Sequence, residues 1–255
     1  MSDRLEDCEF KLGRAGTHLK ELKRLVNMIL EPNSERVPGE FDEASGKYIF
    51  KRESMSPALL GSGGGAVIGD VVHNLHACLD YIAWELSNGR GDNRTSFPIY
   101  ELETDFDKGA AAKMKGIEGS AQALIKRLQP FAGGPRVRHP SRHPLMVLYR
   151  LEQRDKHKHL NTTVEVAEMR LGGLPDRIQH SDSMRTLLPG RDNAILATLK
   201  LSPDEPRVDV YLDVTRNVAF DPLGPAPRED VIETLIAIDN HIRGVVLPAV
   251  RPYLS

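Results

Sequence analysis

The sequence is poor in cysteine and in aromatic residues, and it contains no long apolar run. Cys8 and Cys78 are its only cysteines. They are too few for a disulfide-rich secreted scaffold or for a zinc finger, so we expect a cytoplasmic protein. Aromatic residues make up 5% of the chain, which disfavours a stacking platform for single-stranded bases. The charged N-terminus MSDRLEDCEF and the lack of about 18 consecutive apolar residues predict neither a signal peptide nor a membrane span.

An excess of charge of one sign is also missing. The chain has 34 Lys and Arg against 36 Asp and Glu, a formal net charge of -2. A protein that coats nucleic acid would need a global basic excess, so only a local basic patch is left open. With 255 residues, 40% of them hydrophobic and 27% charged, the composition is typical of a soluble globular chain of one or two domains.

Helical spacing of apolar residues dominates the first part of the chain. The pattern predicts helices over residues 4–30, 66–87, 120–128, 145–160 and 228–246. In the second of these, the apolar residues follow one line on the helix surface: Ile68, Val71, Val72, Leu75, Leu79, Ile82 and Leu86. The first turns of segment 145–160 are apolar all round, and we expect them to be buried.

The segment 31–65 is rich in helix-breaking residues. It contains Pro32, Pro38 and Pro57 and the run Gly61–Gly65, which predicts a connector with one strand-like piece at 47–51. No strand leads into the glycine run, and no Gly-Lys-Ser or Gly-Lys-Thr ending follows it. We therefore favour a connector over a phosphate-binding loop.

Alternation at period two replaces helical spacing after Asn161. Strand patterns occur in residues 162–166, 194–201 and 207–214, with turn residues between them. The predicted fold class is α+β: a helical bundle of four to five helices with a small antiparallel β-sheet inserted before the C-terminal helix. We expect a bundle over 1–160, a sheet over 161–220 and a helix in 221–255 that packs back on the bundle, in a single compact domain.

The predicted helix 66–87 carries a polar stripe beside its apolar face. His73, His76 and Asp80 occupy positions i, i+3 and i+7, and Trp84 extends the same stripe. His76 can pair with Asp80 one turn away. This stripe is either a polar pair on a helix flank or part of a site.

The predicted helix 145–160 carries two polar stripes. Arg150, Gln153 and His157 share one stripe, and Glu152, Asp155 and His159 share the other. From Gly133 to His159 the segment has seven Lys and Arg, at positions 136, 138, 142, 150, 154, 156 and 158, against acids only at 152 and 155. Arginine and histidine suit an anionic phosphate group, which predicts RNA or a nucleotide as ligand, with a solvated helix end as the alternative.

The segment Gly69-Asp70-Val71-Val72-His73-Asn74-Leu75 through Asp80, followed later by Asp155-Lys156-His157, resembles a family of uncharacterised, largely actinobacterial proteins. Members pair a GDVVHNLRxALD helix with a DKHR helix, and the resemblance covers roughly residues 64–160. The chain departs from the pattern at His76 and Lys158, where arginine is usual. The resemblance draws attention to His73, Asp80, Asp155 and His157 and implies no particular reaction.

The segment from Arg150 to His159 also resembles the ribonuclease members of the HEPN superfamily of helical bundles. These place an arginine and a histidine with four to six residues between them, as Arg154 and His159 or Arg150 and His157 do here. The resemblance implies that the arginine holds the scissile phosphate and the histidine transfers a proton, without a metal. It also implies an active cleft shared across a homodimer.

The sequence therefore predicts a metal-independent ribonuclease acting on RNA or nucleotide phosphodiesters, with no cofactor. The residues expected to carry catalysis are His73, Asp80, Arg150, Arg154, Asp155, His157 and His159. The second hypothesis is a helical-bundle enzyme that binds a divalent transition metal. Its ligands would come from the facing stripes, namely His73, His76, Asp80, Glu152, Asp155 and His159.

The third hypothesis is a non-catalytic module for ligand binding or for defence-associated interactions. Under either enzyme hypothesis, His73 and Asp80 should meet the polar residues of helix 145–160 in one cleft, because both stripes lie beside apolar faces that must pack together.

Overall fold

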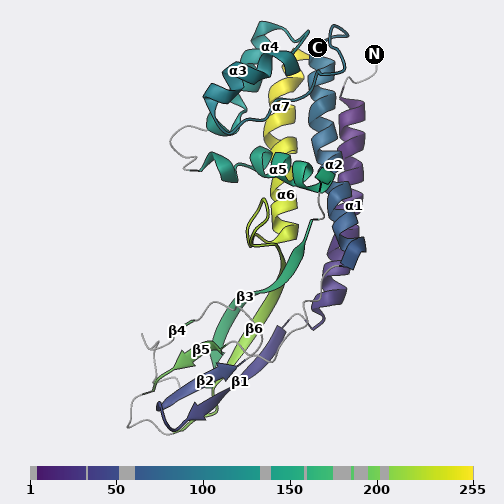
Figure 1. Cartoon of the computed structure of the whole chain (residues 1–255). Coiled ribbons are helices and arrows are strands. Elements are labelled where there is room, and N and C mark those ends of the chain that lie inside the picture. The colour runs from purple at the N-terminus through teal and green to yellow at the C-terminus, as the bar shows by residue number, and fades with distance from the viewer. Residues whose placement is uncertain are drawn as a thin grey trace. The chain divides into compact units, whose positions relative to one another are not determined.

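The computed structural model describes two compact units. It covers residues 5–32, 34–51, 61–132, 139–157, 160–174, 185–186, 195–201 and 207–254. The helical unit comprises Met1–Leu25, Gly61–Thr162 and Phe220–Ser255, and the sheet unit comprises Val26–Leu60 and Thr163–Ala219. The fold class is α+β, as predicted (Figure 1).

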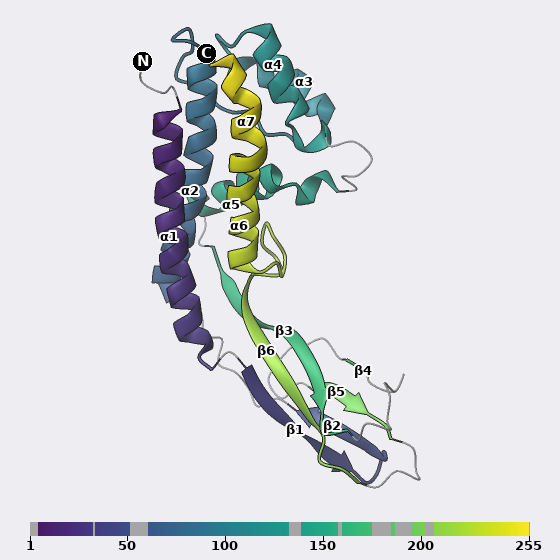
Figure 2. The same ribbon diagram turned by 180° about the vertical axis from the view of Figure 1, so that it is seen from behind.

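The helices are close to those expected from the spacing of apolar residues. They are α1 (Glu6–Leu30), α2 (Gly61–Leu86), α3 (Glu103–Lys113), α4 (Gly119–Arg127), α5 (Pro144–His157), α6 (Val231–His241) and α7 (Leu247–Val250). A π-helical turn, Ile242–Val246, joins α6 to α7, and short 3-10 turns occupy Pro130–Ala132, Pro140–Arg142 and Arg251–Tyr253. Within the helical unit, α1, α2 and the α6–α7 rod run alongside one another, and α5 lies across them (Figures 1 and 2). The expected bundle of four to five helices is therefore not confirmed.

Helix α2 is the central helix of its unit. Its predicted apolar residues are all at most 5% exposed. The helix starts at Gly61, five residues before the expected position, so Gly61–Gly65 is helical and is not part of a connector. Helix propensity alone does not predict this start, because glycine disfavours helices. Tertiary contacts hold these glycines in the helix. Gly65 provides one such contact, since a Cβ there would lie 3.4 Å from the carbonyl oxygen of Leu160.

Helix α5 begins at Pro144, where proline is favoured, and ends at His157, three residues earlier than expected. Leu145, Leu148 and Leu151 are fully buried, whereas Val147 and Tyr149 are half-buried, so the predicted burial of its first turns is confirmed for one face only. Helix α3 was not predicted. It contains Gly109 and buries only Phe106 and Ala110, so its apolar periodicity is weak.

A disulfide bond between Cys8 and Cys78 joins α1 to α2. The two residues are 70 positions apart in the chain and both are buried. The sequence indicated too few cysteines for a disulfide framework, and spacing alone gave no reason to pair these two. A cytoplasmic location stays a prediction.

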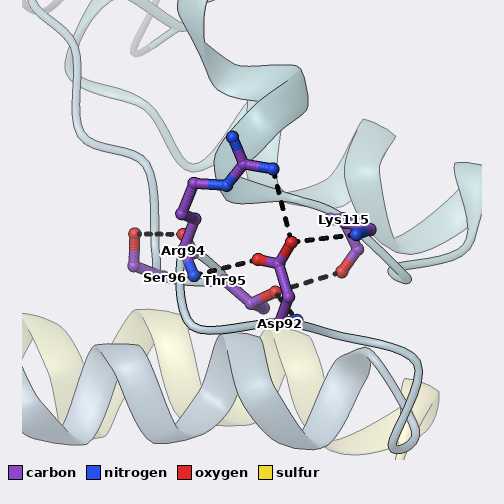
Figure 3. Close-up of polar contacts among 5 residues, drawn as sticks. All are labelled: Asp92, Arg94, Thr95, Ser96 and Lys115. Atoms are coloured by element: carbon purple, nitrogen blue, oxygen red, sulfur yellow. Dashed lines mark hydrogen bonds and ion pairs between the residues drawn. The ribbon is translucent and has the colours of Figure 1, made fainter.

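The loop between α2 and α3 is braced by the carboxylate of Asp92 (Figure 3). Lys115 Nζ donates to Asp92 Oδ2 at 2.9 Å, and the backbone N–H of Arg94 donates to Oδ1 at 2.9 Å. The backbone N–H of Asp92 in turn donates to Thr95 Oγ1 at 2.9 Å, while that hydroxyl donates to the carbonyl of Lys115 at 3.4 Å. These bonds tie the loop to the turn after α3.

The described residues of the sheet unit form six strands, so the sheet is larger than the small sheet that was predicted. They are β1 (Ser34–Asp42), β2 (Lys47–Lys51), β3 (Thr162–Gly172), β4 (Arg185–Thr186), β5 (Ile195–Leu199) and β6 (Tyr211–Phe220), in the order β3-β6-β1-β2-β5-β4. The pairs β1–β2, β1–β6, β2–β5 and β4–β5 are antiparallel, as expected. Buried residues such as Phe50, Leu199 and Leu212 form its core.

Strands β1 and β2 correct the prediction that 31–65 is mostly connector and that 1–160 is helical. Only the piece at 47–51 was expected. Pro38 and Gly39 conceal β1 in the sequence, because neither residue suits the interior of a strand. In the structure, β1 pairs with β6 from Ser34 to Pro38 and with β2 from Gly39 to Asp42, so these two residues stand where the strand changes partner. Within the described parts of the chain, no helix is long and apolar enough to cross a membrane.

Candidate functional site

A polar cluster formed by His73, Glu152 and Lys156 connects α2 to α5, and we refer to it as the His73 cluster. His73 Nδ1 lies 3.6 Å from Glu152 Oε1, and Lys156 Nζ lies 3.1 Å from the same oxygen. The Glu152 side chain is only 4% exposed, whereas that of His73 is 63% exposed. A buried carboxylate therefore faces one nitrogen of an imidazole that is otherwise open to solvent.

A glycine lets the two helices approach closely enough for this cluster. A Cβ atom on Gly69 would lie 2.7 Å from Asp155 Oδ2, so no other residue fits there without a shift of Asp155. Gly69 precedes His73 by one turn of α2, and Asp155 follows Glu152 by about one turn of α5. The two contacts are therefore neighbours on the same helix-helix interface.

The predicted stripe on α2 is divided between two environments. His73 faces Glu152, as described above. His76 Nδ1 lies 3.4 Å from Asp80 Oδ2, which confirms the expected pair. Asp80 Oδ1 also accepts a hydrogen bond from the backbone N–H of Phe97 at 3.0 Å, so this carboxylate holds the segment after the α2–α3 loop.

Lys113 at the end of α3 adds a second ammonium group to this side of the helical unit. Burial lowers the pKa of Lys113, the charge of Lys156 lowers it further, and the charge of Asp80 opposes the shift. Its Nζ lies 5.6 Å from the ring centroid of Tyr100 and 5.9 Å from that of Tyr149. The sequence gave no reason to include Lys113, because α3 itself was not predicted.

The other predicted stripe of α5 faces a different part of the helical unit. Arg150 donates to Glu101 Oε2 at 2.5 Å and lines a cavity of about 510 Å³ beside the start of α6. Arg154 lines a small depression next to Asp221 and Pro225. Arg150 and Arg154 are one turn apart and so share a side of α5, whereas Glu152 lies about 200° around the helix from Arg150. The two stripes therefore serve separate surroundings.

Several predicted site residues cannot be compared with this geometry. The side chain of His157 and all of His159 lie outside the described residues. The expectation that Asp80 and these histidines share a cleft consequently stays a prediction. Asp155 is described, and its carboxylate packs over Gly69.

The set of His73, His76, Asp80, Glu152, Asp155 and His159 was the proposed ligand set for a metal. Among the residues that the structure describes, no group of three or more His, Cys, Asp or Glu side chains is arranged to hold a metal ion. His73 faces Glu152, while His76 and Asp80 face each other, so the described members do not converge on one point.

Glu152 was named from the sequence only as a metal ligand. Its contact with His73 joins residues 79 positions apart and agrees with the expectation that His73 meets the polar residues of helix 145–160. The single available signal was a carboxylate on the stripe that packs toward α2, next to the apolar Leu148 and Leu151.

Comparison with known proteins leaves the family of this chain unassigned. No protein-family model, curated protein or solved structure matches it. The resemblances to the actinobacterial family and to the HEPN superfamily accordingly stay predictions.

Proposed function

We propose that the protein cleaves RNA or related phosphodiesters without a metal, with His73 as the group that transfers the proton. The observation that carries this proposal is the His73–Glu152 pair, in which an exposed imidazole has a buried carboxylate 3.6 Å from its Nδ1. The separation of 3.6 Å is longer than a hydrogen bond, so the proposal requires the ring to close on Glu152 when the substrate binds. A carboxylate hydrogen-bonded to one ring nitrogen fixes the tautomer and leaves the other nitrogen able to accept a proton. The ring nitrogen Nε2 has no hydrogen-bond partner within the described part of the chain.

The proposed reaction starts at the ribose 2′-hydroxyl. His73 Nε2 accepts its proton while the 2′-oxygen attacks phosphorus, and the bond between phosphorus and the 5′-oxygen breaks. A second acid protonates the leaving oxygen, and the product is a 2′,3′-cyclic phosphate. Lys156, His157 and His159 are the candidates for this acid, because they follow Glu152 on the same segment.

Positive charge near His73 supports a phosphodiester as the substrate. The Lys156 ammonium lies 3.1 Å from Glu152, and Lys113 is close enough for its pKa to respond to the charge of Lys156. Cations placed beside a phosphate stabilise the charge that develops on its oxygens in the transition state. The HEPN resemblance implies Arg150 and Arg154 as phosphate-binding residues. They would contact phosphates of the same RNA strand that lie farther from the bond that is cleaved.

The decisive test is RNA cleavage by the purified full-length protein in the presence of EDTA. We expect cleavage to persist and to leave a 2′,3′-cyclic phosphate. His73→Gln should lower kcat by about 10²-fold to 10⁴-fold, the usual contribution of general acid–base catalysis. His139→Gln is the matched control, since His139 is an exposed histidine outside the cluster.

Glu152 acts as a positioning residue in this proposal, so its replacement should have a different kinetic signature. Glu152→Gln should lower kcat by about 10-fold to 100-fold with little change in KM, because Glu152 does not touch the substrate. Circular dichroism must show that the variant is folded, since Glu152 is buried. Uncleaved RNA with folded protein, or equal activity of His73→Gln and the unmodified protein, would overturn the proposal. Activity that disappears with EDTA and returns with a metal would favour the metal-dependent hypothesis instead.

A further inference from the structure

A cavity of about 510 Å³ lies within the helical unit, between the start of α5 and the start of α6. Its volume is within the range of sites for small organic ligands. Apolar walls come from Pro144 and Val147 on α5 and from Ile238 on α6. Charged side chains of both signs stand among these walls: Arg142, Arg150, Glu229, Asp230 and Glu233.

Two of these five charged side chains are already engaged. Arg150 is hydrogen-bonded to Glu101, and Asp230 Oδ1 accepts from the backbone N–H of Glu233 as the N-cap of α6. The side chains of Arg142, Glu229 and Glu233 have no hydrogen bond or ion pair within the described parts of the chain. The cavity thus presents one unpartnered cation and two unpartnered anions beside an apolar wall.

We propose that this cavity binds a zwitterion with an apolar body, of the class of short apolar peptides. The ligand carboxylate would contact Arg142, whose planar guanidinium matches a carboxylate in a two-point hydrogen bond. The ligand ammonium would contact Glu229 or Glu233. Its side chains would cover the half-buried Pro144 and Val147, which removes apolar surface from water.

Both charges of the ligand are needed for this fit. A purely anionic ligand would meet the two glutamates as like charges, and a purely cationic ligand would meet Arg142 in the same way. Arg150 does not alter this balance, because Glu101 neutralises it. The cavity and the His73 cluster use different sides of α5, so the proposal is independent of the proposed catalytic activity.

The test is calorimetric titration of the full chain with the dipeptide leucyl-leucine. Two matched probes each lack one charge: N-acetyl-leucyl-leucine and leucyl-leucinamide. We expect the unblocked dipeptide to bind and each blocked form to bind about tenfold or more weakly, because each loses a charge-assisted hydrogen bond. Free leucine, with less apolar surface, should bind more weakly than the dipeptide.

Substitution of the charged residues that line the cavity tests which side chain contacts each charged end of the ligand. Arg142→Gln should remove the preference for the free carboxylate, and Glu229→Gln or Glu233→Gln should weaken the preference for the free ammonium. Glu233 lies in the first turn of α6, whereas Glu229 precedes the helix. If Glu233→Gln reduces stability, Glu229→Gln provides the same test with the first turn intact. Arg24→Gln on α1 is the control for an exposed arginine outside the cavity. Three outcomes would overturn the proposal: no binding of leucyl-leucine at millimolar concentration by folded protein, equal binding of the blocked peptides, or unchanged selectivity in Arg142→Gln.

Discussion

At the scale of single residues, the half-buried Asp92 makes several contacts at once. Its carboxylate accepts from Lys115 and from the backbone of Arg94 (Figure 3). These interactions, with Lys115 the largest, hold the pKa of Asp92 at about 2, well below the ordinary value of 3.8. The ionised form is therefore the one that braces the loop.

Replacement of Asp92 should make this contribution visible as a pH dependence. Because its pKa is lowered on folding, the stabilisation is present above about pH 4 and is lost as the pH falls toward about 2. Asp92→Asn should therefore lower Tm near neutral pH, and the difference from the unmodified protein should shrink as the pH falls. Thermal unfolding followed by circular dichroism tests this, with Asp105→Asn as the control, because Asp105 is an exposed carboxylate on α3 without an ion pair among the described residues. A Tm difference that is the same at every pH would contradict the assignment.

At the scale of elements, the start of α5 depends on a neutral imidazole. His143 Nδ1 accepts from the backbone N–H of Leu145 at 3.2 Å, so it acts as a cap of the helix. Its ring also meets that of His241 edge to face, with centroids 4.7 Å apart. Burial, and then the neighbouring His241, lower the pKa of His143 to about 4, and burial lowers that of His241 as well.

This cap predicts destabilisation in mild acid. A histidine with a lowered pKa stabilises the fold above its unfolded pKa of 6.5, and the contribution is lost as the pH falls toward about 4. His143→Ala should lower stability at neutral pH by about 1 kcal/mol and should reduce the loss seen between neutral and mildly acidic pH. Urea unfolding at both pH values measures this, with exposed His139→Ala as control. If the free energy of unfolding of His143→Ala depends on pH as strongly as that of the unmodified protein, His143 is not the source of the pH dependence.

The elements also show what apolar periodicity can and cannot reveal. Helix α2 could be predicted because a single line of apolar residues faces the core. Strand β1 could not be predicted, because proline and glycine are unusual inside a strand. Pro38 and Gly39 are tolerated here because β1 changes its pairing partner between them. For the site, periodicity placed His73 and Glu152 beside apolar faces. Packing of these faces brings His73 to Glu152, as expected. The contact of Asp80 with the backbone of Phe97 could not be expected, because it depends on the course of the loop between α2 and α3.

At the scale of the whole molecule, the disulfide bond is a covalent constraint between two helices of one unit. It closes a loop that includes all of β1 and β2, since Cys8 and Cys78 are 70 residues apart. A cross-link over such a loop lowers the entropy of the unfolded chain and contributes up to about 4 kcal/mol.

Reduction should consequently lower the stability of the protein. We expect dithiothreitol to shift the urea midpoint of the unmodified protein downward. The double variant Cys8→Ala, Cys78→Ala should be less stable and insensitive to the reductant, which makes it the matched control. An identical midpoint with and without dithiothreitol, together with two free thiols by mass spectrometry, would show that the cross-link does not form in solution.

Gly69 has a consequence for how the chain can vary. It has no side chain that could act on a substrate, yet it lies one turn from His73, against Asp155. A methyl group at this position would lie 2.7 Å from a carboxylate oxygen of Asp155, so this side chain would have to turn away from α2. The packing of Asp155 beside the His73 cluster therefore depends on a residue that has no side chain and no chemistry of its own. A survey of variants that considered only reactive residues would overlook it.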